Sequence, residues 1–262
     1  MLRVESVMGM PIRIDVRDPE VGPEAVQAAF DWLVWVDEMF STYKPDSEIS
    51  RINRGELALD DAHSDVTGVL ARCSQLGELT GGYFDAWAVA RGLAGDARDP
   101  SVFLPGAVEP SGLVKGWSVE RAGKVLEAHG ARNYSVNAGG DIRARGAALP
   151  ATTWRIGIQH PQHSDAIAAV VEGNDLAVAT SGAYERGNHV IDPHTGATPR
   201  DVLSATIVGD DLGTADAYAT AALAMGAAAP EWSTQLVGYE ALLILADGTM
   251  LSTRGFPFGA IG

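Results

Sequence analysis

The chain has 262 residues, of which 46% are apolar and 20% charged, with a formal net charge of −15 and one cysteine. A single cysteine excludes an intramolecular disulfide and a thiolate metal cluster, and the acidic balance argues against nucleic-acid binding, which needs clustered Lys and Arg. A polyanionic substrate would therefore need a local cation, an arginine or a helix N-terminus.

The first half of the chain predicts one strand and three long helices. Alternating apolar residues predict the strand over 7–16. Pro23 opens an amphipathic helix that runs through Phe40, and a second helix is expected from about Asp65 to Leu79. Ser118 is expected to be the N-cap of a third helix, which Gly130 ends.

The second half predicts mainly strands. Short strands are expected over 133–136 and 176–180, and the alternation in 154–160 predicts a half-buried strand. The segments 241–245 and 250–253 flank a turn and predict a hairpin. Because strands come in pairs and runs between helices, we expect an α+β fold, with a single domain over residues 1–262.

The segment 214–225 combines small and apolar residues with one acid, Asp216, and a hydroxyl four residues later, Thr220. Helical spacing would put both side chains on one face, and two oxygen ligands suit a hard cation such as Mg²⁺. The alternative is a buried helix in which Asp216 caps the start and Thr220 bonds back to a carbonyl. The segment alone leaves both interpretations open.

Five glycine-bearing segments could let backbone amides approach phosphates or aromatic rings, namely 80–85, 112–116, 137–141, 180–182 and 192–196. None is a Walker A motif or a dinucleotide fingerprint, and each taken alone is also an ordinary turn. Lys115 lies between two glycines just before the expected third helix. Its ammonium and that helix N-terminus could face one anion, or Lys115 could be a solvated loop residue.

Two histidines and one tyrosine are further candidates. His189 precedes the apolar pair Val190-Ile191, which would put it on a strand, where it could take a proton from a hydroxyl. His194 lies in a turn and is expected to be exposed. Either histidine could instead be structural or solvated. Tyr43 follows the first helix and could stack on a planar ligand or cover the core.

Taken together and in order, eight segments resemble the FAD:protein FMN transferase (ApbE-like) family, and they cover nearly the whole chain. They are 7–10, 40–53, 80–85, 112–117, 137–141, 179–186, 189–196 and 215–221. The resemblance implies a T-fold-related α+β architecture with an antiparallel sheet and packed helices. It also implies an enzyme that binds FAD with Mg²⁺, moves FMN onto a threonine hydroxyl of an acceptor flavoprotein and releases AMP.

The resemblance assigns roles to particular residues. It implies that Mg²⁺ is held by Asp216, Thr220 and the main-chain carbonyl of Val114, where the family commonly has alanine, and that His189 activates the acceptor hydroxyl. It further implies an FAD site that includes Met8, Tyr43, Tyr83, Phe84, Asp85, Ser111, Lys115, Trp117 and Ile191.

Two other functions stay open at this stage. If water replaces the acceptor hydroxyl, the same site becomes a Mg²⁺-dependent FAD pyrophosphatase that gives FMN and AMP, and the same pocket could also serve a non-enzymatic FAD-binding protein. Many bacterial members carry an export signal or lipid anchor. The N-terminus has neither, and no apolar run is long enough to cross a bilayer. We therefore expect a cytoplasmic protein without a membrane anchor, whose acceptor is available there.

Overall fold

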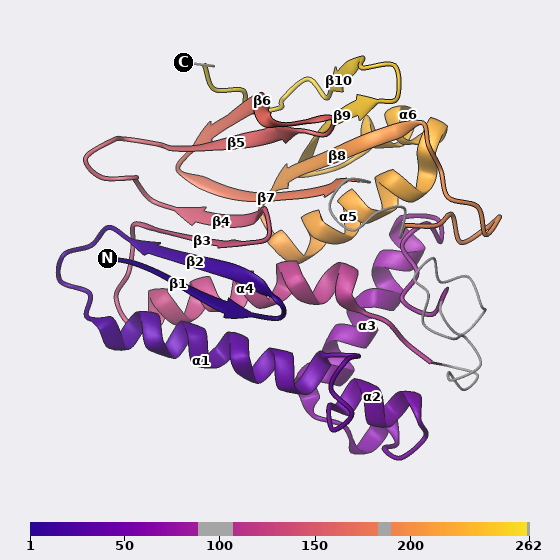
Figure 1. Ribbon diagram of the computed structural model, residues 1–262, viewed down its shortest axis with the longest axis horizontal. Helices are drawn as coiled ribbons and strands as arrows, with labels where there is room; N and C mark the ends of the chain where they lie inside the picture. Colours follow the sequence, from indigo (N-terminus) through magenta and orange to yellow (C-terminus); the bar gives the residue numbers. More distant parts are fainter. Residues whose placement is uncertain (89–106, 183–189, 261–262) are drawn as a thin grey trace.

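The centre of the molecule is an eight-stranded antiparallel sheet (Figure 1). The computed structural model describes residues 1–88, 107–182 and 190–260. In spatial order the strands are β1 (Leu2–Val7), β2 (Met10–Val16), β3 (Tyr134–Ala138), β4 (Asp141–Arg145), β7 (Asp175–Gly182), β8 (Val202–Gly209), β9 (Tyr239–Leu245) and β10 (Met250–Ser252).

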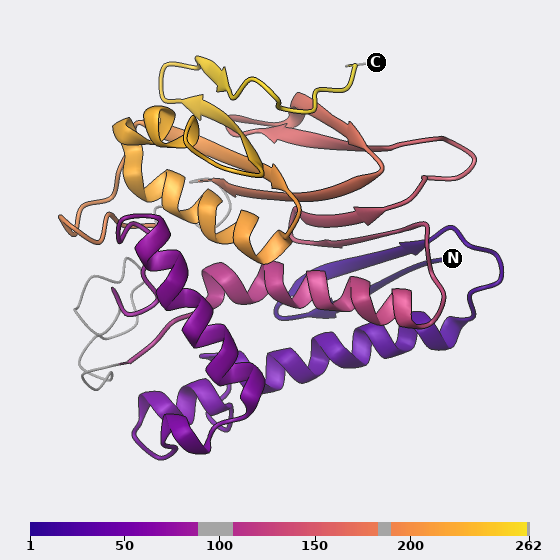
Figure 2. The same ribbon diagram turned by 180° about the vertical axis from the view of Figure 1, so that it is seen from behind.

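Different elements cover the two faces of this sheet. The long helices lie on one face, whereas a two-stranded hairpin packs on the other (Figures 1 and 2). The helices are α1 (Pro23–Phe40), α2 (Glu48–Asn53), α3 (Ser64–Leu79), α4 (Ser111–Ala128), α5 (Leu212–Met225) and the short α6 (Ala229–Ser233), with single 3₁₀ turns η1 (Leu59–Asp61) and η4 (Gly226–Ala228). The hairpin consists of β5 (Trp154–His160) and β6 (His163–Gly173).

Burial follows from this layering. In β5 every second residue from Trp154 to Ile158 is buried, because one face packs on the sheet and the other meets solvent. β8 is covered on both faces, and nearly all of its residues are buried. The small residues of α5 are buried almost all round, since this helix contacts β7 and β8 on one side and α4 on the other.

Most of the periodic elements agree with the sequence prediction. The helices over 23–40 and 65–79, the strand over 154–160 and the hairpin formed by 241–245 and 250–253 are all confirmed, within a residue or two at each end. The arrangement is α+β, as predicted. No helix among the described residues is both long and apolar enough to cross a membrane.

Two predicted boundaries are wrong. The strand expected over 7–16 is broken at Met8 and Gly9, whose φ angles of 55° and 73° turn the chain back into the β1–β2 hairpin. The third helix starts at Ser111 rather than after Ser118. Ser118 is buried inside α4, where its hydroxyl donates to the Lys115 carbonyl at 2.7 Å, so it is not an N-cap.

Asp18 ties the connection after β2 to the start of β3. Its carboxylate accepts hydrogen bonds from the backbone amides of Arg132 and Asn133 at 2.8 and 2.7 Å, and from the Asn133 side chain at 2.6 Å. Burial alone would raise the pKa of Asp18, but these hydrogen bonds outweigh it and lower the pKa below its usual value.

We expect Asp18→Asn to lower the free energy of unfolding by about 1–3 kcal/mol at neutral pH, because an amide nitrogen would leave buried N–H donors unpaired. A depressed folded-state pKa contributes stability above the unfolded value of about 4, and this contribution is lost as the pH falls through the folded value. Urea denaturation should therefore show the difference from wild type shrinking in acid. Asp60→Asn, at an exposed position, is the control, and an equal loss in both variants would contradict the prediction.

Candidate active site

Helices α4 and α5 approach most closely at Gly116. A Cβ added there would lie 2.4 Å from the Leu212 carbonyl oxygen and 2.8 Å from the Asp216 Cβ, both nearer than real Cβ contacts. Only glycine therefore fits at this crossing. The close approach lets the Gly116 amide donate to Asp216 Oδ2 at 3.0 Å, which fixes the direction of that carboxylate.

Asp216 and Thr220 share the α4-facing side of α5, as the sequence spacing predicts. Gly116 faces Asp216, and one turn earlier a Cβ at Gly112 would lie 3.4 Å from Thr220 Oγ1. The alternative in which Asp216 caps the helix is wrong, because Asp211 caps α5 by accepting from the Thr214 amide at 2.8 Å. The Thr220 hydroxyl lies 3.4 Å from that of Ser181 on β7.

A buried charge cluster surrounds Asp216. Lys115 Nζ lies 3.0 Å from Asp141 Oδ2 and 3.9 Å from Asp216 Oδ1. The side chains of Asp141 and Asp216 are 0% and 3% exposed, and that of Lys115 is 18% exposed. Three elements, α4, α5 and β4, thus bring two buried carboxylates and one partly exposed ammonium together.

This cluster perturbs its carboxyl groups. Burial and the neighbouring Asp141 raise the pKa of Asp216 well above its ordinary value, and Lys115 offsets only part of this. Burial also raises the pKa of Asp141, against the opposing effect of the Lys115 ammonium. Two buried carboxylates beside one ammonium leave an excess negative charge, and a divalent cation would relieve it.

The oxygens here suit Mg²⁺. Carboxylate, hydroxyl and carbonyl oxygens are the donors that hard cations take, and Asp216 and Thr220 supply the first two. Val114 lies in the second turn of α4, between the two glycines that face Thr220 and Asp216. Its carbonyl is in a helix rather than the expected loop, but a carbonyl oxygen has a second lone pair beyond the helical bond. The residues therefore fit the metal.

Two loops hold the residues of the expected FAD site that lie near the start of α4. Phe84 is buried, and its ring is 3.2 Å from where a Gly112 Cβ would stand. Tyr83 packs edge-on against His194 with ring centroids 4.7 Å apart, and His194 Nε2 contacts the Gly81 carbonyl at 3.0 Å. Ser111, the first residue of α4, donates to Glu109 at 2.6 Å.

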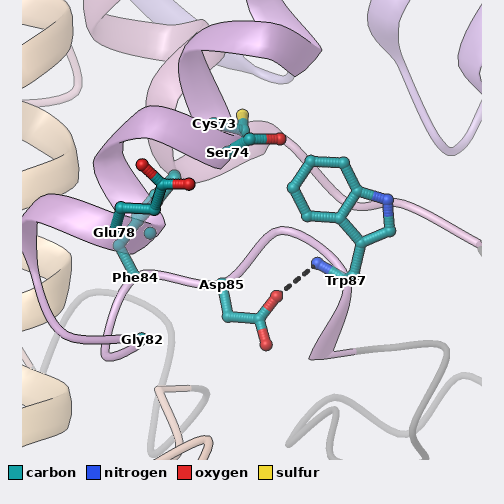
Figure 3. A pocket seen from close by; sticks show the side chains of 8 residues that line it. Cys73, Ser74, Glu78, Gly82, Phe84, Asp85 and Trp87 are labelled. Atoms are coloured by element: carbon teal, nitrogen blue, oxygen red, sulfur yellow. Dashed lines mark hydrogen bonds between the residues drawn. The ribbon is translucent and has the colours of Figure 1, made fainter.

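A pocket of about 370 Å³ lies between α3 and the loop that follows it (Figure 3). Phe84 and Asp85 line it with Trp87, whose amide donates to Asp85 Oδ1 at 2.8 Å. Cys73 also lines the pocket, but burial raises its pKa to about 12. The thiol therefore stays protonated near neutral pH and is no nucleophile.

The remaining candidates lie elsewhere. Trp117 packs against Trp32 and Phe40 of α1, with centroids 5.4 and 5.3 Å apart, so its ring lies on the α1 side of α4. Tyr43 is 75% exposed after α1. Met8, in the β1–β2 turn, is partly buried between two core clusters.

Residues 190–192 form no strand, so the strand expected for Val190-Ile191 is wrong, and Ile191 lies partly buried in an irregular segment. His189 lies outside the described residues. Sequence reasoning missed Asp141 as a site residue, although the glycine-bearing segment that ends with it had been singled out.

Comparisons with known proteins find matches over most of the chain. Residues 8–92 and 102–243 match the ApbE family model. An FAD:protein FMN transferase of Vibrio cholerae is 30% identical over 234 residues, which cover 73% of this chain and 70% of the relative. The corresponding protein of Haemophilus influenzae is 28% identical over 240 residues, covering 73% and 69%.

Solved structures share the fold. The flavin transferase ApbE from Vibrio cholerae superposes with a TM-score of 0.86 at 24% identity and 99% coverage of both chains. The ApbE protein from Thermotoga maritima superposes with a TM-score of 0.80 at 24% identity and 97% coverage of both. These likenesses confirm the α+β architecture that the resemblance implied.

Gly116→Ala should lower the free energy of unfolding by about 1–3 kcal/mol, because the added methyl group forces α4 and α5 apart. The thermal stabilisation that we expect from Mg²⁺ should also be smaller in this variant, since the amide that orients Asp216 moves. Gly68→Ala is the matched control in α3, where a Cβ meets nothing within 4 Å. We expect that variant to be neutral or more stable by up to about 1 kcal/mol. Similar melting curves for both variants would contradict the prediction.

Asp216→Asn should raise the melting temperature of the metal-free protein above neutral pH and remove the stabilisation by Mg²⁺. The folded-state pKa of Asp216 is raised, so wild-type stability falls as the pH rises from the unfolded value of about 4 through the folded value. Each kcal/mol gained in the free energy of unfolding raises the melting temperature by about 2–4 °C in a chain of this size. Thermal denaturation of both proteins, followed at a series of pH values in EDTA and in Mg²⁺, checks this prediction. The exposed Asp165→Asn is the control. A lower midpoint for Asp216→Asn in EDTA would contradict it.

Proposed function

Because the chain belongs to the ApbE family, we propose that it is a Mg²⁺-dependent FAD:protein FMN transferase, formed by one flavin transferase domain over residues 1–262. It moves FMN from FAD onto a threonine hydroxyl of an acceptor flavoprotein and releases AMP. The observation that carries this proposal is the cluster in which Asp216 and Thr220 face α4 beside the Lys115 ammonium.

In this proposal Asp216, Thr220 and the Val114 carbonyl hold Mg²⁺. The bound ion supplies positive charge that neutralises the FAD pyrophosphate and stabilises charge developing at phosphorus. The excess negative charge of the buried carboxylates supports the assignment, because a cation site in a dry environment must itself be anionic. The alternative role of Asp216 as a helix cap is already taken by Asp211.

The chain's own residues have separate tasks. Lys115, partly exposed at the edge of the cluster, brings a second positive charge toward the pyrophosphate in a protein whose net charge is −15. His189 accepts the proton of the acceptor hydroxyl, a role that rests on the family resemblance. The acceptor oxygen then bonds to the FMN phosphorus, and the bond from that phosphorus to AMP breaks, with AMP keeping the electron pair.

The FAD site is assigned to residues of several segments, of which Tyr43 is expected to pack on the flavin. They are Met8 of the β1–β2 turn, Tyr43 after α1, Tyr83, Phe84, Asp85 and Ser111 around the start of α4, Trp117 within α4, and Ile191. The exposed ring of Tyr43 supports a stacking role, since a planar ligand would cover it with little rearrangement of the core. The Tyr83–His194 contact supports a common wall made by two loops distant in sequence. The cytoplasmic location expected from the sequence belongs to the same proposal, and cell fractionation tests it.

The direct test is incubation of the purified chain with FAD, Mg²⁺ and the apo form of a flavoprotein that carries FMN on a threonine. We expect the acceptor to gain the mass of an FMN residue while AMP appears in equal amount. An acceptor in which that threonine is valine is the matched control. FMN and AMP released without acceptor modification would identify a pyrophosphatase, and FAD that survives unchanged would identify a binding protein.

His189→Ala separates chemistry from binding. We expect the rate of FMN transfer to fall by about 10²–10⁴-fold, the usual contribution of a general base, while FAD binding is retained. Equilibrium dialysis with FAD gives the binding, and mass spectrometry of the acceptor gives the rate. The exposed His129→Ala in the α4 C-cap is the control. Full activity of His189→Ala would rule out its role as base.

A further inference from the structure

Asp141 has no part in the function proposed so far, although it is among the most buried polar residues of the chain. It is the first residue of β4 and follows the turn at Gly139 and Gly140, whose φ angles are 56° and 95°. Its Oδ1 accepts from the Thr180 amide at 3.3 Å. The turn and the neighbouring strand β7 thus fix this carboxylate in the core.

Asp141 is the nearer carboxylate to Lys115. The ammonium is 3.0 Å from Asp141 Oδ2 but 3.9 Å from Asp216 Oδ1, which is beyond hydrogen-bond distance. The other oxygen of Asp216 accepts from the Gly116 amide. Lys115 is therefore held to one side of the carboxylate that is proposed to bind the metal.

Without the Asp141 carboxylate, the Lys115 ammonium would lose its nearer partner. A lysine ammonium is a point charge on a flexible stem and pairs with whichever carboxylate is within reach. Asp216 Oδ1, at 3.9 Å, is within reach of the same ammonium. Pairing there would neutralise Asp216 and put a competing cation against the oxygen that Mg²⁺ needs.

We propose that Asp141 is a positioning residue, which holds the Lys115 ammonium away from Asp216 and so keeps the Asp216 carboxylate available to Mg²⁺. The inference rests on the proposed metal site. It gives the glycine turn before β4 a function, since the turn delivers a carboxylate to a side chain of α4.

A purely structural brace between α4 and β4 already exists. Glu120 of α4 pairs with the buried Arg143 of β4, with 3.1 Å between Glu120 Oε2 and Arg143 Nε. This pair joins the same two elements as Lys115 and Asp141, and it is also buried. Glu120→Gln is therefore a matched control, which should not change the affinity for Mg²⁺.

The test is a double-mutant cycle on Mg²⁺ binding, measured by calorimetry on the full chain without FAD. Asp141→Asn should weaken Mg²⁺ binding by about ten-fold, within the range of coupling between neighbouring charged residues. Lys115→Met should tighten binding far more in the Asp141→Asn background than in wild type, because there the lysine no longer pairs with Asp141 and competes more strongly for Asp216. A crystal structure of Asp141→Asn should show Lys115 Nζ within hydrogen-bond distance of Asp216.

Several results would overturn the role of Asp141. One is a Mg²⁺ affinity of Asp141→Asn equal to that of wild type. Another is a change in Mg²⁺ affinity on Lys115→Met that is equally large with and without Asp141, because a simple long-range effect of the lysine charge predicts equal changes. If Asp141→Asn does not fold, Asp141→Ser takes its place in the cycle. Weaker Mg²⁺ binding by Lys115→Met than by wild type would also overturn the proposal. Absence of Mg²⁺ binding by the wild-type chain would instead remove the metal site and the proposed function with it.

Discussion

The close approach of α4 and α5 at Gly116 is the constraint on which the rest of the site depends. Any larger residue would meet the Leu212 carbonyl, so glycine alone lets the Gly116 amide reach Asp216. The same crossing sets Gly112 opposite Thr220 and carries Lys115 to Asp141 on the sheet. The positions of the site residues on α4, α5 and β4 thus depend on the absence of a side chain at Gly116.

The surroundings of the cluster explain how the fold tolerates it. α5 is made of small residues and lies between the sheet and α4, so the chain can bury Asp216 without leaving voids around it. Carboxylates in such a place reduce stability until a cation arrives, and large apolar clusters on both faces of the sheet offset this. In the proposed function, stability and affinity for Mg²⁺ therefore oppose each other at this site, as is common where function requires buried charge.

Local patterns sufficed for part of the fold and part of the site. The apolar stripe of α1, the alternation in β5 and the turn between β9 and β10 each carry their own signal within a few residues. The i, i+4 spacing of Asp216 and Thr220 gave their common face in the same way. Residue roles beyond that came from the family resemblance, since spacing cannot tell a metal ligand from a cap.

By itself the sequence determined the α+β class, the main periodic elements and the family to which the chain belongs. The tertiary structure alone decided that 112–116 is helix rather than loop, that Ser118 lies inside α4, and that Asp141 faces Lys115. The reason is that glycine has two uses, as a flexible turn residue and as a site of close packing. Which use applies to Gly116 depends on a helix a hundred residues further along the chain, and no local pattern contains that information.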